Sequence, residues 1–539
     1  MESDKYGIVA FILPSTFLQH KSYEFVRKWI FHNFSRVWVV EFDKDARTGV
    51  ATSNIFDTQQ GRCMLFCSRT DGKGKAAIRY ASVADLDTDE KTARLESLLE
   101  RAVRSQDLEG IFSRVEPPKD SVNDICAFKP TAPHDGRQYD AFWNLTDTDP
   151  ANRIFQRHTS GVKLGMTAAL THLDKGQLSR RVRDMADMNK THADLTERWF
   201  KDQKKLPPES SLSGEIRISM QKGSADPQKH IKKYSFRPFV NAFAFLHDDT
   251  LQKAARSGGG GTRRRPEVLA AFSKNDNPGI SVAPSPVDLG ASMQRISSFC
   301  WHIPDNDLCK RGNGHVFCPT FPEYKTSRGK RGWSESNHNN INPLLKDALR
   351  ASGVGSKSLG ADVLFYVYAV LSSGFYLERF EGALYSTGRW PKIPMFGGTT
   401  FAKLVSLGRQ MAECEKDVLV DPTRESKTLS GDGIRLEKYK INAPDGTITL
   451  SGYDSRRYVL DGFDRSCLEH VISGYVVFDQ YLKRNKWAYL RRNFTNEDVQ
   501  KLYALNEALS RQLELISQAD CLIESALEAQ ELINPPTTA

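Results

Sequence analysis

Long apolar segments are missing from this chain of 539 residues. Its longest apolar run, residues 361–373, covers 13 residues and contains Asp362, whereas a helix that crosses a membrane needs about 20. The first residues also lack a basic stretch followed by an apolar one, which is the pattern of a secretory signal. We therefore expect a cytoplasmic protein with no part in a membrane.

The chain also lacks the cysteine spacing of a disulfide framework, because its nine cysteines are scattered. Cysteine and histidine are densest between residues 300 and 318, but no Cys-x-x-Cys pair typical of a zinc knuckle occurs there. The residues concerned are Cys300, His302, Cys309, His315 and Cys318. Buried thiols and loop histidines explain this density more simply than zinc does, so we predict no metal site.

Neither sign of charge dominates the sequence. Lysine and arginine number 75 and aspartate and glutamate 66, which gives a formal net charge of +9. This mild excess permits an anionic partner such as nucleic acid but does not require one. Any hypothesis of DNA binding must therefore depend on local clusters of basic residues.

The beginning of the chain has the pattern of an α/β sheet. Apolar runs at residues 7–18, 37–42 and 62–68 read as strands, and residues 23–30 between the first two read as a helix. A parallel sheet needs several strands and two covered faces. We therefore predict that residues 1–75 form the terminal strands of a larger, Rossmann-like sheet, ended by the turn at Asp71-Gly-Lys-Gly-Lys75.

Three further parts follow in the sequence. Residues 76–210 contain helical patterns at 84–108 and 175–205 and predict a helical connector, its second helix charged and exposed. Residues 211–350 are rich in glycine, proline and aromatics and predict a loop-rich α+β part. Residues 351–539 predict a mainly helical part with β-hairpins at about 431–464, a turn at Asp445-Gly446, and a terminal helix that begins with Asn496 as its N-cap.

Several segments, in order, resemble type ISP restriction–modification enzymes and related adenine-N6 DNA methyltransferases. The most specific segment is 362–373 together with Phe375-Tyr376, Arg379-Phe380 and Trp390-Pro-Lys-Ile-Pro394. The other segments are residues 7–18, 54–56, 61–66 and 154–167, Tyr234-Ser-Phe-Arg-Pro-Phe239, Val316-Phe-Cys-Pro-Thr-Phe-Pro322, and Ser473-Gly-Tyr475 with Tyr481-Leu-Lys-Arg484. The resemblance implies the end of a methyltransferase domain followed by a target-recognition region.

The resemblance also indicates which chemical parts to look for. In this family a glycine-rich turn holds S-adenosylmethionine, and an Asn/Asp-Pro-Pro-Tyr/Phe loop holds the extruded base. Both precede the segment that residues 7–18 resemble, so we expect neither here. The resemblance then implies no catalytic or cofactor-binding residue on this chain, with S-adenosylmethionine on a partner subunit that carries the catalytic half.

Three clusters of basic residues and one isolated arginine are candidates for contacts with double-stranded DNA, because cations neutralise phosphates and arginine can read base edges. The candidates are Lys483, Arg484, Lys486, Arg491 and Arg492, interleaved with Trp487 and Tyr489; Arg263, Arg264 and Arg265 after four glycines; Lys325, Arg328, Lys330 and Arg331; and Arg237 among aromatic residues. The alternatives are a solvated helix face, an exposed linker and, for Arg237, a buried cation stacked on rings.

These observations predict a DNA-binding target-recognition component that presents adenine to a catalytic half on another chain. One alternative is a non-enzymatic defence or regulatory protein that binds DNA and derives from a methyltransferase. A truncated product of a broken reading frame is a third possibility, and it predicts poor solubility.

Overall fold

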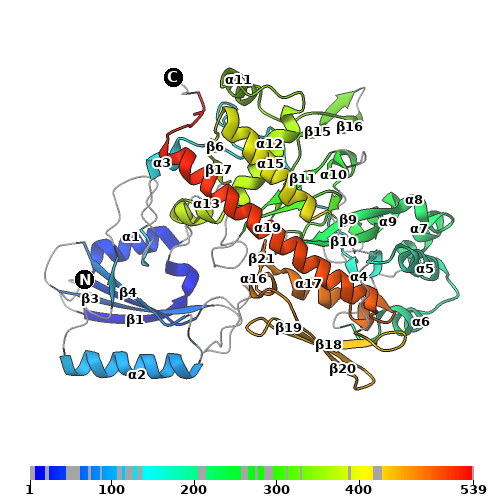
Figure 1. The fold of residues 1–539 in the computed structure, drawn as a ribbon, viewed down its shortest axis with the longest axis horizontal. Coiled ribbons are helices and arrows are strands. Elements are labelled where there is room, and N and C mark those ends of the chain that lie inside the picture. The colour runs from blue at the N-terminus through cyan, green and yellow to red at the C-terminus, as the bar shows by residue number, and fades with distance from the viewer. Residues whose placement is uncertain are drawn as a thin grey trace.

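The protein is described by a computed structural model in which one long C-terminal helix runs across a body of several small sheets and many helices (Figure 1). The described residues are 7–18, 23–43, 61–70, 75–84, 86, 88–105, 112–115, 126–129, 136–203, 214–256, 265–272, 277–284, 295–310, 314–327, 330–386, 390–416 and 428–536.

The N-terminal sheet has five strands in the order β1-β3-β2-β4-β5. The strands are β1 (Gly7–Pro14), β2 (Arg36–Glu41), β3 (Arg62–Arg69), β4 (Ala77–Ser82) and β5 (Ser113–Arg114). Only β2 and β4 pair in parallel, whereas β1–β3, β2–β3 and β4–β5 are antiparallel. The sheet is therefore mixed, and the expected Rossmann-like sheet is not confirmed. Its strands also extend past the boundary expected at residue 75.

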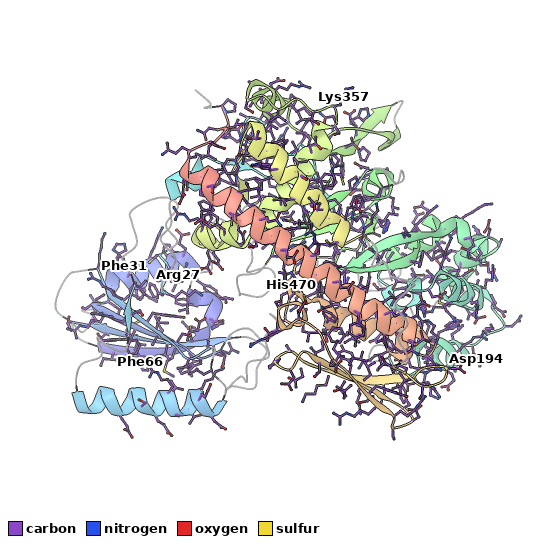
Figure 2. All side chains as sticks on the ribbon, in the orientation of Figure 1. Arg27, Phe31, Phe66, Asp194, Lys357 and His470 are labelled. Atoms are coloured by element: carbon purple, nitrogen blue, oxygen red, sulfur yellow. The ribbon has the colours of Figure 1, made fainter. Side chains whose placement is uncertain are left out.

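Helices cover this sheet on its two faces. A short 3-10 helix (Ser15–Leu18) and α1 (Glu24–Asn33) pack on one face, and α2 (Thr88–Ser105) lies against the other (Figure 1). Arg27 of α1 is buried and donates hydrogen bonds to the carbonyls of Phe17 and Cys126, at 2.7 and 2.8 Å. In Figure 2, Arg27 and Phe31 lie on the α1 side of the sheet, and Phe66 lies lower, toward α2.

The edge strand β1 keeps much of its apolar surface exposed. Ile8 and Ile12 are 81% and 54% exposed, and both share a sheet face with the exposed Phe66, since Ala10 between them pairs with Phe66. Among the described residues β1 pairs only with β3, so its outer edge carries no strand. An exposed apolar edge of this kind is a template for another polypeptide.

Residues 136–203 and 214–256 form short helices and the first strands of two four-stranded sheets. The helices are α3 (Gly136–Asp140), α4 (Thr167–Leu170), α5 (Lys175–Ala186), α6 (His192–Leu195), a π-helix (Thr196–Phe200), α7 (Gly214–Ser224), α8 (Pro227–His230) and α9 (Asp248–Arg256). The single exposed helix expected at 175–205 is wrong. It is broken after Ala186, and Leu178, Val182 and Met185 are buried in the core.

The two sheets have the orders β13-β9-β10-β8 and β12-β11-β14-β7. Because β7 and β8 come from the expected connector, residues 76–210 do not form a separate helical part. The strands are β7 (Thr159–Ser160), β8 (Thr171–His172), β9 (Ile231–Arg237), β10 (Val240–Phe245), β11 (Gly279–Val282), β12 (Ser297–Cys300), β13 (Ile303–Pro304) and β14 (His315–Phe317). Next to them lie α10 (Pro266–Ala271) and a long hairpin of β15 (Thr320–Ser327) and β16 (Lys330–Asn339).

The helical part surrounds α12, most of whose residues are buried. Its helices are α11 (Pro343–Ala351), α12 (Leu359–Ser372), α13 (Gly374–Arg379), α14 (Glu381–Ser386), α15 (Gly398–Cys414) and α19 (Asn496–Glu528), and the short strands β6 (Trp143–Asn144) and β17 (Lys392–Ile393) pair beside them. A buried network joins Arg295 to Tyr368, Glu415 and Gln512. This network links the segment just before β12, helix α12, the C-cap of α15 and helix α19.

The β-hairpins expected at 431–464 are confirmed as a three-stranded sheet, β18-β19-β20, with the turn at Gly446 in the left-handed region (φ +62°). The remaining elements are β18 (Leu436–Asn442), β19 (Thr447–Gly452), β20 (Arg457–Leu460), α16 (Arg465–Leu468), β21 (Val471–Ile472), β22 (Tyr475–Val476), α17 (Val477–Arg484) and α18 (Trp487–Leu490). The expected N-cap is off by one residue, because Thr495 caps α19 while the Asn496 side chain bonds the backbone of Leu429.

Candidate nucleic-acid interface

Arg237 lies inside the fold. It ends β9, and its guanidinium donates to an Asp305 carboxylate oxygen at 2.9 Å and stacks over the rings of Phe236 and Tyr475. The hydroxyl of the buried Tyr234 lies 2.8 Å from the other Asp305 oxygen. Of the two alternatives for Arg237, this geometry favours the buried cation stacked on rings over a clamp for phosphate.

Two of the five cations between residues 480 and 495 also hold the chain together. Arg492 makes a two-pronged ion pair with Asp498, at 2.5 and 2.8 Å, and Asp498 is 1% exposed. Arg491 adopts a left-handed conformation (φ +55°) and donates to the backbone carbonyls of Trp199 and Lys201. The guanidinium N–H groups of these two arginines thus donate largely to oxygen atoms of this chain.

The other three cations of this segment have different surroundings. Arg484 stacks over Phe236 and Tyr489, with its guanidinium carbon 4.5 and 5.3 Å from the ring centres. Lys486 lies over the ring of Tyr439 at 5.0 Å. Lys483 is exposed on α17. The segment is therefore mainly a packing surface between α17, α18 and the neighbouring strands.

The second cluster lies on the β15–β16 hairpin. Lys325 pairs with Gly332, Thr326 with Arg331 and Ser327 with Lys330, so these cations sit toward the hairpin's tip. Arg328 lies outside the described residues. A two-stranded ribbon can enter the major groove of DNA. Lys325, Lys330 and Arg331 lie near the tip of this ribbon, the part that would enter the groove first.

In the third cluster, Arg263 and Arg264 lie outside the described residues. Arg265 immediately precedes α10 and lies 3.7 Å from Glu267, whose carboxylate also accepts a hydrogen bond from Thr159. Arg265 is thus held next to an internal acid at the start of a helix.

A basic surface that the sequence did not single out lies on the β18–β20 sheet. Lys438 and Lys440 are two residues apart on β18 and share a face, and Arg457 lies on the same face because Ser451 pairs with both Lys438 and Arg457. All three are exposed, whereas Ile448, Leu450 and Leu460 bury the opposite face in the core. We call Lys438, Lys440 and Arg457 the basic sheet face.

Lys440 and Arg457 make no ion pair with any other residue that the structure describes, while Lys438 lies 3.2 Å from Glu437. Thr449 and Val459 continue the same face beside Lys440. The sequence signal was available, since Lys438-x-Lys440 has the alternation of a strand with one solvated face. This alternation alone does not mark a binding surface, because it does not show which cations have partners.

The cysteine and histidine residues between 300 and 318 lie in two different kinds of surroundings. Cys300, Cys309 and Cys318 are buried, with Cys309 against Ser281. His315 instead faces His158, with their Nδ1 atoms 2.7 Å apart. Within the part of the chain that the structure describes, no group of three potential ligands could hold a metal ion.

The described part of the chain contains no helix that is long and apolar enough to cross a membrane. No curated protein matches the sequence. A family model, the Type ISP C-terminal specificity domain, matches residues 153–515.

The fold resembles three solved structures of DNA complexes. An ATP-dependent Type ISP restriction–modification enzyme, LlaBIII, bound to DNA matches with a TM-score of 0.59 and 16% identity, over 96% of this chain and 33% of that one. A nuclease-deletion mutant of the Type ISP enzyme LlaGI with a DNA substrate mimic matches with a TM-score of 0.59 and 16% identity. This match covers 95% of this chain and 39% of that one. A DrdV–DNA complex matches with a TM-score of 0.57 and 17% identity, over 97% of this chain and 50% of that one.

The mixed α/β fold is thus that of the matching parts of these three proteins, and the chain spans a third to a half of their length. Because the family model covers more than half of the sequence, the chain belongs to the Type ISP C-terminal specificity domain family.

Proposed function

We propose that this chain is the DNA-binding, target-recognition component of a Type ISP-like system. The match of the specificity-domain model to residues 153–515 carries the proposal. The similar solved structures, which are complexes with DNA, support duplex DNA as the partner.

Two surfaces offer the contacts that such a component needs. The basic sheet face supplies three exposed cations with little internal compensation, which suits the phosphate contacts that fix position on a duplex. The β15–β16 hairpin is a ribbon with basic residues toward its tip, which suits reading of base edges. We propose that the basic sheet face binds the phosphates of the duplex and that the hairpin contributes to recognition of the base sequence.

The exposed apolar edge of the N-terminal sheet supports a second partner. Ile8, Ile12 and Phe66 share one face, and the outer edge of β1 pairs with no described strand. On this proposal the edge docks against a catalytic half on another chain, to which the specificity domain presents an adenine extruded from the duplex.

The methyl donor, S-adenosylmethionine, belongs to that catalytic half in this proposal. The turn after β1 does not fit the cofactor, because Pro14 and Ser15 stand there instead of glycine and the 3-10 helix buries Phe17 and Leu18. No methyl-transfer step is therefore assigned to residues of this chain.

The proposal is tested by adding a separately expressed catalytic half, chosen as a neighbouring reading frame with a glycine-rich turn and an Asn-Pro-Pro-Tyr-type loop. Purified chain alone should shift random duplexes without methylating adenine, and the mixture should methylate. DNA binding with no complementing partner would favour the non-enzymatic alternative. Methylation by the chain alone would contradict the division into two halves.

A further inference from the structure

Two arginines far apart in the sequence line one small cavity between α5 and α17. Arg181 and Arg484 meet there with His172, Gln203, Phe236 and Tyr489, around a space of about 30 Å³ that is partly open to solvent. A space of this size holds roughly two water-sized groups. We call these six residues the arginine pocket.

Arg181 is only partly satisfied by the protein. Its side chain is 1% exposed, and Nη1 donates to the carbonyls of Ala168 and Thr171 at 2.6 and 3.2 Å. Nε and Nη2 are buried and have no hydrogen-bond partner among the described residues. Burial, with Arg491 nearby, lowers the pKa of Arg181 to about 9.

Arg484 lacks a counter-charge of its own. Its guanidinium stacks between Phe236 and Tyr489, and its buried Nε has no partner among the described residues. Burial, followed by repulsion from Arg237, lowers the pKa of Arg484 to about 10. The nearest acid, Asp305, is already paired with Arg237.

The other polar residues restrict what can enter. His172 accepts a hydrogen bond at Nδ1 from the Asp174 amide at 2.8 Å, which leaves the ring proton on Nε2, and the backbone of Leu490 also lies within reach of the ring. Gln203 donates Nε2 to the carbonyls of Trp199 and Ala488, which fixes Oε1 as an acceptor without a partner among the described residues. The pocket therefore offers several donors and one acceptor, a set suited to an oxyanion that also carries a proton or a bridging water.

One buried and one half-buried guanidinium without a paired carboxylate are costly for the fold, because an uncompensated charge loses part of its hydration there. Proteins usually place an acid beside such a group, and none that the structure describes pairs with Arg181 or Arg484. We propose that one or two oxygens of a phosphate oxyanion enter the arginine pocket from its open side and supply the missing negative charge. The oxyanion is either a backbone phosphate of the bound duplex, a source that rests on the proposed function, or free inorganic phosphate.

The first experiment measures thermal unfolding of the full chain in sodium phosphate and in sodium chloride at equal ionic strength. A ligand that binds the folded state raises Tm, and we expect phosphate to raise it by about 1 to 3 °C. Arg484→Met keeps an apolar stem against Phe236 and should abolish the rise. Arg180→Gln removes the same charge from an exposed position on α5 and should retain it.

The second experiment titrates a labelled duplex at several salt concentrations. If the oxyanion is a backbone phosphate, Arg484→Met should weaken binding to all sequences and reduce the salt slope by about 1, while Arg180→Gln should not. If Arg484→Met loses the phosphate effect but keeps the salt slope, the site holds free phosphate.

An unchanged Tm of the wild-type chain in phosphate, or an equal rise in Arg484→Met, would overturn the proposal and leave a water-filled structural cavity. Failure of the wild-type chain to bind any duplex would instead contradict the proposed function. In that case, a rise in Tm with phosphate that depends on Arg484 would still support the phosphate site.

Discussion

Cations that are close in the sequence have different surroundings in the fold. Arg492 closes an ion pair on a buried carboxylate, Arg491 binds backbone carbonyls, Arg484 stacks in a pocket, and Lys483 faces solvent. A basic run in a sequence shows which residues carry charge but not where their partners are. The position of each acid, such as Asp498 at the start of α19, decides which cations remain available to DNA.

Arg492→Met should destabilise the fold more than it affects DNA binding. It would leave the carboxylate of Asp498 buried with fewer partners, and that carboxylate also accepts from the backbone and hydroxyl of Thr495 at the N-terminus of α19. We expect a loss of about 3 kcal/mol in the free energy of unfolding, measured with urea. The exposed Lys483→Met serves as the control for stability, and an equal, small loss in both variants would contradict the structural role of Arg492.

Acid should destabilise the protein through its buried histidines. Burial, with His315 nearby, lowers the pKa of His158 to about 4, below the usual 6.5. A histidine that is neutral when folded contributes stability above pH 6.5, and this is lost as pH falls toward 4 because the unfolded chain binds the proton first. His158→Gln should reduce the slope of the unfolding free energy between pH 6.5 and 4, by at most about 1.4 kcal/mol per pH unit. An unchanged slope would show that His158 does not titrate in this way.

At the scale of elements, close packing fixes the helical part. Helices α12 and α15 cross at Gly408, where an added Cβ would lie 2.0 Å from the Phe365 carbonyl oxygen. At Gly360 in α12 the nearest atom would be 3.5 Å away, on Pro319. The absence of a side chain at Gly408 therefore sets the distance between the two helices.

Gly408→Ala should lower the free energy of unfolding by about 1 to 3 kcal/mol, because the helices must move apart. Gly360→Ala is the matched control in the partner helix and should be neutral or slightly stabilising, since alanine favours helix. Urea unfolding of both variants measures the difference. Equal stabilities would show that the α12–α15 crossing adjusts without cost.

The basic sheet face is the element that we expect to contact phosphates. Lys440→Gln and Arg457→Gln should each weaken binding to any duplex and reduce the salt slope by about 1, because each removes one phosphate contact. Arg465→Gln is a suitable control, as Arg465 is exposed on α16 and already lies 3.3 Å from Glu469. Salt slopes equal to that of the wild-type chain in both test variants would remove this face from the interface.

The sequence predicted several elements because their signals are local. The alternation around Asp445-Gly446 gave the β18–β20 hairpins, and the apolar face of residues 358–415 gave the helices around α12. The antiparallel pairing of β1 with β3 depends on contacts between distant residues, which no local pattern contains. The break after Ala186 has a local signal, because Thr191 and Asp194 form a capping box at the start of α6. The distant Arg217 adds hydrogen bonds to the carbonyls of Met185 and Asp187. The same limit applies to the arginine pocket, whose two arginines are about 300 residues apart and come together only in the folded chain.

Over the whole molecule, the specificity domain and the N-terminal sheet present different kinds of surface. The first carries exposed cations on β18–β20, and the second carries exposed isoleucine and phenylalanine side chains on β1 and β3. Charged surface suits a polyanion, whereas an apolar edge suits another polypeptide. We therefore interpret the chain as a link between a duplex and a protein partner.

The most direct test of this account is the binding of a fluorescently labelled random duplex to the purified full chain, measured by anisotropy from 50 to 300 mM salt. We expect binding whose logarithmic affinity falls linearly with the logarithm of salt concentration, with a slope set by several phosphate contacts. No binding at the lowest salt concentration, or an affinity that does not change with salt, would contradict it.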